Sequence, residues 1–84
     1  MKTEFALLAQ YEKSFVPLEI VCQDFFNIGP QKAKQLAARG ELPIPVMRGS
    51  HSQKSPYLVK VSDLASYLDE QYANYRDDWE KVRS

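Results

Sequence analysis

The sequence has little cysteine and histidine, and it lacks any segment that could cross a membrane. One cysteine, Cys22, excludes a disulfide within the chain, and one histidine, His51, leaves no set with zinc-site spacing. No apolar run reaches the roughly 18 residues of a membrane helix, and the start does not form a secretory signal. No Gly-rich phosphate loop is present. We therefore expect a cytoplasmic protein that is not an enzyme and uses no cofactor or metal.

The formal net charge of zero hides a strong local asymmetry. Residues 30–60 contain six basic residues and one acidic residue, a local charge of +5, whereas residues 1–29 carry −2 and residues 61–84 carry −3. A polyanion responds to the local field and not to the sum. The positive middle segment therefore favours a partner that carries phosphates.

With 84 residues, 44% of them hydrophobic, the chain is large enough for one small domain and too apolar for a disordered segment. We expect residues 1–84 to form a single domain. It would consist of an N-terminal extension over residues 1–14, a core over residues 15–68 and a helical extension over residues 69–84.

The first residues of the chain form a short apolar run. Thr3 is a candidate cap for a helix that ends near Tyr11. Periodicity alone leaves a short strand open as the alternative. In the helical interpretation, one side carries Phe5, Leu8 and Ala9.

Two helices joined by a tight turn are predicted next. The first begins at Pro17, whose missing N–H costs nothing in a first turn, and it carries apolar residues at spacings of three and four. Residues 27–30 end it, because Gly29 can take a positive φ and Pro30 can open the next helix. The second helix runs from about Pro30 to Arg39, with Ala33, Leu36 and Ala37 facing inward, and it stops at Gly40. This is the pattern of a helix-turn-helix.

A β-hairpin and a long helix follow. Residues 43–48 contain two prolines, which suit an edge strand, residues 49–56 form a polar loop, and residues 57–61 are rich in β-formers. Ser62 is a candidate cap for a helix that reaches about Val82. We therefore expect a mainly α fold with a small β-hairpin, namely a winged helix-turn-helix with a long C-terminal helix.

The exposed face of the second predicted helix and the hairpin are the candidate DNA-binding surface. Gln, Lys and Arg side chains bind base edges in the major groove or phosphates, and long donors on a β-ribbon can enter the minor groove. A solvated helix face and a surface loop are the alternatives. The candidate DNA-binding residues are Gln31, Lys32, Lys34, Gln35, Arg39, Arg48, Ser52, Gln53, Lys54 and Lys60.

Apolar and aromatic residues also recur at steps of three and four along the last predicted helix. They are typical either of an intramolecular core or of an interface with a partner helix. Stacking on nucleotide bases is a third alternative, which the six acidic residues in this part of the sequence disfavour. The candidate oligomer-interface residues are Leu68, Tyr72, Tyr75 and Trp79.

Two resemblances extend this interpretation. The segment 16–68 resembles the compact winged helix-turn-helix of phage excisionases and MerR-type regulators, through Arg39-Gly40-Glu41-Leu42-Pro43, the wing at 46–61, and Asp63-Leu64 with Tyr67-Leu68. Nearly the whole chain is similar to the pyocin activator protein (PrtN) family. The motifs that carry this similarity are Thr3-x-Phe5 with Leu7-Leu8-Ala9-Gln10-Tyr11, Val16-Pro17-Leu18-Glu19 with Val21-Cys22, Gly40-Glu41-Leu42-x-x-Pro45-Val46-x-Arg48, Ser52-Gln53-Lys54 and Asp63-Leu64-Ala65-x-Tyr67-Leu68-Asp69.

The resemblance implies a sequence-specific regulator that binds double-stranded DNA and activates prophage or bacteriocin genes. Two further partners, a second copy of the chain and RNA polymerase, are left open, and no membrane partner is expected. Two alternatives also stay open. One is an excisionase-type architectural factor that bends DNA, and the other is a phage-encoded protein-interaction module that uses the last helix.

Overall fold

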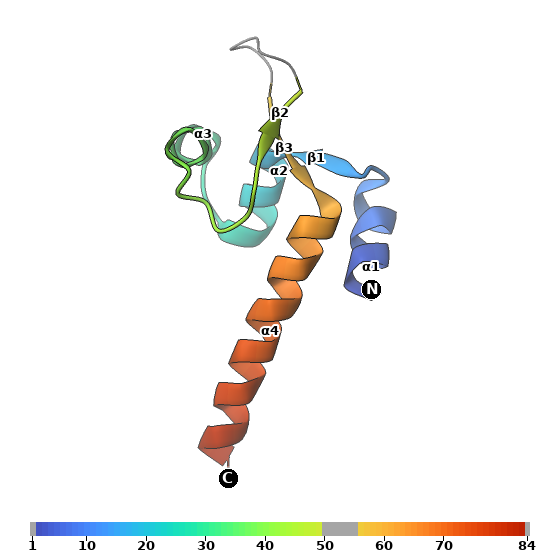
Figure 1. Cartoon of the computed structure of the whole chain (residues 1–84), viewed down its shortest axis with the longest axis vertical. Coiled ribbons are helices and arrows are strands. Elements are labelled where there is room, and N and C mark those ends of the chain that lie inside the picture. The colour runs from blue at the N-terminus through green and yellow to red at the C-terminus, as the bar shows by residue number, and fades with distance from the viewer. Residues whose placement is uncertain (1, 50–55, 84) are drawn as a thin grey trace.

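The computed structural model describes residues 2–49 and 56–83, with principal extents of 53, 27 and 16 Å. Figure 1 shows a body at one end and a long helix that projects away from it. The fold is mainly helical, with a three-stranded antiparallel sheet and a long C-terminal helix. In chain order the elements are α1 (Lys2–Tyr11), β1 (Phe15–Pro17), α2 (Leu18–Val21), the π-helical turn η1 (Cys22–Phe26), α3 (Pro30–Arg39), β2 (Met47–Arg48), β3 (Tyr57–Lys60) and α4 (Val61–Arg83).

The N-terminal run is a helix and not a strand, but it buries a different face from the predicted one. Leu7 is 5% exposed, whereas Phe5 is 65% exposed. The reason is that α1 packs along the first turns of α4. Thr3 lies inside α1, where its hydroxyl donates a hydrogen bond to Asp69 Oδ1 at 2.6 Å, so the prediction that it caps the helix was wrong. Ala9 is also exposed, and of the three apolar residues predicted to share one side only Leu8 packs against the core.

The first helix of the predicted helix-turn-helix starts later than predicted and is not entirely α-helical. Pro17 is the residue before α2, and after one turn the helix continues as η1. The left-handed residue that ends it is Asn27, with φ of 54°, and not Gly29, whose φ is −68°. Asn tolerates this region through local hydrogen bonding, whereas Gly29 is extended, as the residue before a proline prefers. Pro30 opens α3 as predicted.

The predicted hairpin is present as β2 and β3, and β1 adds a third strand in the order β1-β3-β2. Val16 pairs with Val59 across β1 and β3, and both side chains are buried. β2 is shorter than the predicted strand. Residues 43–46 stay outside the sheet because proline lacks the N–H that a ladder requires.

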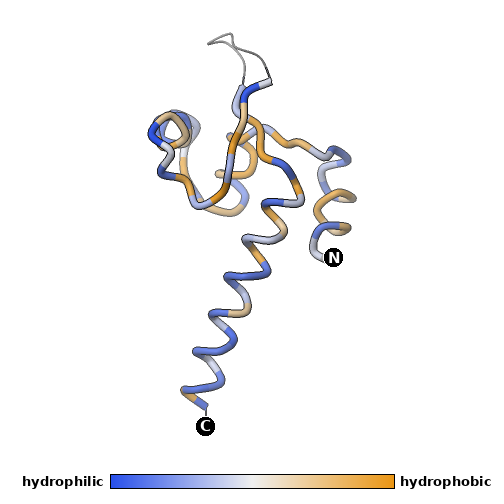
Figure 2. Tube along the Cα trace, viewed as in Figure 1, coloured by the Kyte–Doolittle hydropathy of each residue, from blue (hydrophilic) through white to orange (hydrophobic). Residues whose placement is uncertain are grey.

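The hydrophobic core lies where the sheet, α1, α2, α3 and the first turns of α4 meet, and Figure 2 shows the hydrophobic residues concentrated in the body. α4 begins at Val61, one residue before the predicted cap Ser62, and it continues directly from β3. None of the helices in the described ranges is both long and apolar enough to cross a membrane. The largest fully buried side chains are Val16, Leu18, Val21, Cys22, Val59, Val61 and Leu64.

Candidate nucleic-acid interface

α3 turns a polar and cationic face to solvent. Ala33 is fully buried, and Leu36 and Ala37 are half-buried, so these residues attach the helix to the body. The contacts of α3 are with α2 and η1, which leaves its other face open. The predicted inward and outward faces of this helix are therefore confirmed. The exposed polar residues are Gln31, Lys32, Lys34, Gln35 and Arg39.

Both ends of α3 are fixed by local backbone chemistry. Pro30 occupies the first turn, where its φ is already helical. At the other end Gly40 adopts φ of 67°, its N–H donates to the Ala37 carbonyl at 3.1 Å, and the Glu41 N–H donates to the Leu36 carbonyl at 2.9 Å. These bonds satisfy carbonyls that the helix end would otherwise leave unpaired. The polar face therefore has a defined length and position.

One cation of this face is paired with an acid. Lys34 Nζ lies 3.3 Å from Glu19 Oε1 on α2, and both side chains are more than half exposed. A pair this exposed contributes about 0–1 kcal/mol and is weakened by salt. Lys34 is thus held near α2 but stays accessible to another anion. Within the described residues, Lys32 and Arg39 form no ion pair.

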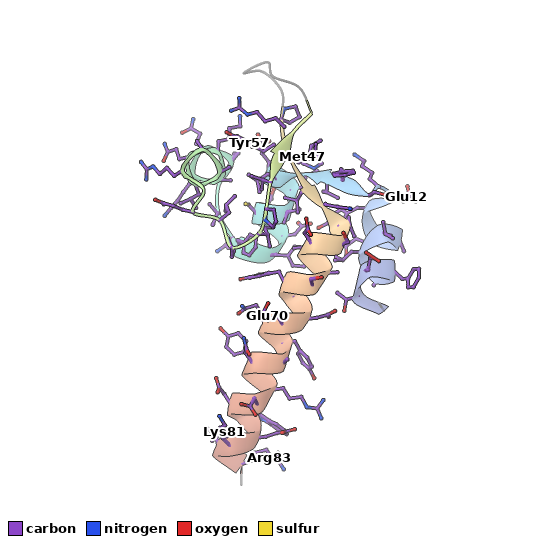
Figure 3. All side chains as sticks on the ribbon, viewed as in Figure 1. Glu12, Met47, Tyr57, Glu70, Lys81 and Arg83 are labelled. Carbon is purple, nitrogen blue, oxygen red and sulfur yellow. The ribbon has the colours of Figure 1, made fainter. Side chains whose placement is uncertain are left out.

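Arg48 is held at the base of the hairpin. It pairs in register with Tyr57, and its Nη2 donates a hydrogen bond to the Tyr57 hydroxyl at 2.8 Å. The guanidinium also lies over the Tyr57 ring, 4.5 Å from the centroid. Figure 3 shows Tyr57 and Met47 where the hairpin leaves the body. Stacking of this kind orients the charge, while the exposed guanidinium keeps further donors for a phosphate.

Of the other predicted DNA-binding residues, the structure describes only Lys60, which lies away from this surface. Ser52, Gln53 and Lys54 lie outside the described residues. Lys60 is exposed at the far end of β3, opposite Phe15 of β1, beside a hollow that Glu4 and Ser14 also line. That end of the sheet faces α1, whereas α3 lies on the other side of the body (Figure 1). The face of α3 and the base of the hairpin therefore form the described part of the candidate interface.

The sequence did not reveal the two residues that orient cations of the candidate interface. These are Glu19, beside Lys34, and Tyr57, beside Arg48. The first contact joins two helices, and the second depends on the register of the hairpin. Neither is encoded in local periodicity. A hairpin with a two-residue turn would have revealed its register, but eight residues separate Arg48 from Tyr57.

The predicted oligomer-interface residues divide into two groups. Leu68 packs against the core of its own chain. Tyr72, Tyr75 and Trp79 lie further along α4 and are exposed, so they do not form an intramolecular core.

Groups of acidic, Cys or His side chains that could hold a metal ion are absent from the described part of the chain. Cys22 is fully buried, and burial raises the pKa of its thiol. A buried thiol with a raised pKa is a poor nucleophile, because the thiolate is the reactive form.

Comparison with known proteins identifies a family. A family model described as Pyocin activator protein PrtN matches residues 3–74, from α1 into the second half of α4. Comparisons with curated proteins and with solved structures find no match. The family match includes α3, the hairpin and Leu68, and it ends before Tyr75. Since it spans most of the sequence, the chain belongs to the PrtN family of pyocin activator proteins.

Proposed function

We propose that this protein is a winged helix-turn-helix regulator that binds double-stranded DNA sequence-specifically and activates bacteriocin or prophage genes. The proposed reading helix is α3, and the hairpin of β2 and β3 is the proposed wing. The observation that carries the proposal is the outer face of α3, where all five polar residues are exposed. Membership in a family of pyocin activators supports the regulatory role.

The chemistry of α3 suits duplex DNA. An α-helix fits the major groove, where Gln can pair with adenine and Arg or Lys with guanine. Gln31 and Gln35 lie one helical turn apart, so they can reach neighbouring base pairs. Lys32 and Arg39 supply phosphate contacts, and Arg48 adds a stacked cation at the hairpin.

The proposal is for a binding protein in the cytoplasm and not for an enzyme.

Activation additionally requires a contact with RNA polymerase. The acidic helix α4 projects its distal part away from α3 (Figure 1), which leaves that part accessible to a second protein while DNA is bound.

The direct test is selection of a site from a random duplex library, followed by fluorescence anisotropy on that site across a salt series. With about five phosphate contacts, affinity is expected to fall roughly 10²- to 10³-fold between 50 and 200 mM salt, because each contact releases counterions. An affinity that does not change with salt concentration, or the absence of binding at low salt, contradicts the proposal.

Matched substitutions then test α3 itself. Lys32→Ala is expected to weaken all sequences alike and to reduce the salt slope by about 1, whereas Gln35→Ala is expected to lose about 1–3 kcal/mol of discrimination between sites. The control variants are Gln10→Ala, within α1, and Lys13→Ala, just after it. They make the same chemical changes at exposed positions and should leave DNA binding unchanged. Equal effects of the α1-side and α3 substitutions would show that α3 does not read DNA.

A further inference from the structure

We propose that the distal part of α4 pairs with the same segment of a second copy of the chain in antiparallel orientation. The contact face is formed by four side chains, which we name the distal stripe: Tyr72, Tyr75, Trp79 and Val82. The result is a dimer with a two-fold axis perpendicular to the two helices. This inference does not depend on DNA binding.

The distal stripe is unusually exposed for its composition. The exposed fractions are 64% for Tyr72, 72% for Tyr75, 55% for Trp79 and 85% for Val82. Together with Arg76 and Asp78 these residues line a shallow groove along the helix. Aromatic side chains bury about 150–250 Å² each, so the stripe presents on the order of 400 Å² of apolar surface. Patches of that size on monomers are often functional.

The spacing identifies the kind of partner. From Leu68 the apolar residues follow at steps of four, three, four and three, the a/d pattern of a coiled coil. When the a/d pattern is continued toward the N-terminus, it falls on Ala65 and Val61, which are buried in the core of this chain. One face of α4 is therefore covered by the chain's own body in its first half and is uncovered in its second half. A second helix with the same pattern is the matching occupant.

The position of the body favours an antiparallel orientation of the two α4 helices. In a parallel pair, Ala65 and Leu68 of the second copy would face their counterparts in this chain, where the body already covers them. In an antiparallel pair, the C-terminal end of the second copy lies beside Tyr72 and stops before Leu68. Figure 1 shows that this half of α4 projects clear of the body, so both bodies fit at opposite ends.

Charge complementarity supports the same register. Pairing a with d positions places Tyr72 against Val82 of the second copy and Tyr75 against its Trp79. Arg83 of the second copy then lies beside Asp69 at both ends. Asp69 Oδ1 already accepts a hydrogen bond from the Thr3 hydroxyl, and the exposed carboxylate can accept a second donor. Figure 3 shows Arg83 at the end of α4, where it also lies over the Trp79 ring at 4.6 Å.

The same register brings like charges together at the centre. The two Arg76 side chains approach on one flank, where each is already paired with Glu80 at 3.2 Å. The two Asp78 side chains approach on the other flank. Standard interfaces bury about 800 Å² on each partner, and this short contact lies at the lower end, so we expect a dimer that forms at micromolar concentrations.

Analytical ultracentrifugation from about 1 to 500 μM, without DNA, tests the pairing. Trp79 is the only tryptophan, so its emission is expected to shift to shorter wavelength as dimer forms. Tyr75→Glu should give a monomer throughout this range, while Asn74→Glu, the same change on the neighbouring outer face, should still dimerise. Both sites are exposed, and circular dichroism checks that the helix persists. A wild-type monomer with solvent-exposed Trp79 at the highest concentration overturns the proposal.

Three charge variants test the orientation. Arg83→Asp is expected to weaken the dimer about fivefold, since two exposed pairs become repulsive, and adding Asp69→Arg to the same chain should restore it. Asp78→Asn should tighten the dimer because it removes the central repulsion. In a parallel pair Asp78 would instead face the second copy's Arg83. Because Asp69→Arg also removes the hydrogen bond from Thr3, Thr3→Ala is the control and should dimerise like the wild type. Weakening by Asp78→Asn, or failure of Asp69→Arg to rescue when Thr3→Ala dimerises normally, therefore overturns the antiparallel arrangement.

Discussion

Gly40 determines where α3 ends. Its φ of 67° lies in the left-handed region, which a Cβ atom disfavours by about 1–2 kcal/mol. A Cβ built at Gly40 meets no atom within 4 Å, so the penalty for a larger residue there is purely conformational. A substitution at Gly40 therefore measures the free-energy cost of a positive φ, separately from any steric clash.

Gly40→Ala is therefore expected to lower the free energy of unfolding by about 1 kcal/mol, measured by urea denaturation followed by circular dichroism. Gly29→Ser is the matched control, because Gly29 has φ of −68° and equally open surroundings. Serine at this N-cap should leave stability unchanged or raise it by up to about 1 kcal/mol. Equal losses at both glycines would contradict the described turn.

At the scale of elements, a side-chain hydrogen bond joins α1 to η1. The Tyr11 hydroxyl donates to Asp24 Oδ2 at 2.7 Å. Partial burial first, and then this hydrogen bond and the charge of Asp24, raise the pKa of Tyr11 well above its usual value of 10.0. The protonated phenol is thus favoured in the folded state.

Tyr11→Phe is expected to lower the free energy of unfolding at pH 7 by up to about 1 kcal/mol. Because the folded pKa exceeds the unfolded one, the contribution of Tyr11 is complete below about pH 10 and is lost as the pH rises further. The decline in stability above pH 10 should therefore be shallower in Tyr11→Phe than in the wild type. Denaturation curves at pH 7 and between about pH 9.5 and 11 measure this, with Tyr75→Phe at low protein concentration as the exposed control. Parallel wild-type and Tyr11→Phe curves would contradict the assignment.

Elements specified by local chemistry could be predicted from the sequence, and those specified by long-range pairing could not. Pro30 and Gly40 mark α3, and its periodicity gives the correct buried face. β1 escaped prediction as part of the sheet because Phe15 pairs with Lys60, far along the chain. The inward face of α1 escaped for the same reason, since α4 determines it. In the candidate site, the cations of α3 were predictable, but the acid beside Lys34 was not.

At the scale of the whole molecule, the proposed dimer and the proposed DNA surface combine into one expectation. A two-fold axis relates two reading helices, so the selected DNA site should be an inverted repeat. Tyr75→Glu should bind a full site far more weakly than the wild type and should keep its preference for the same half-site sequence, as measured by anisotropy on full and half sites. Asn74→Glu should match the wild type on both. Selection of a single, non-repeated site would contradict the combination.

The junction between β3 and α4 contains no loop. β3 ends at Lys60, α4 begins at Val61, and the Val61 N–H donates to the Ser14 carbonyl at 2.8 Å, which fixes the joint to the rest of the body. One strand of the hairpin and the helix that we expect to bind a second copy are thus a single regular segment from Tyr57 to Arg83. Such a segment has a fixed length, unlike a linker that can stretch. The dimer should therefore bind only when the two half-sites are separated by a fixed number of base pairs. Inserting half a helical turn of DNA between them should abolish simultaneous binding of both copies.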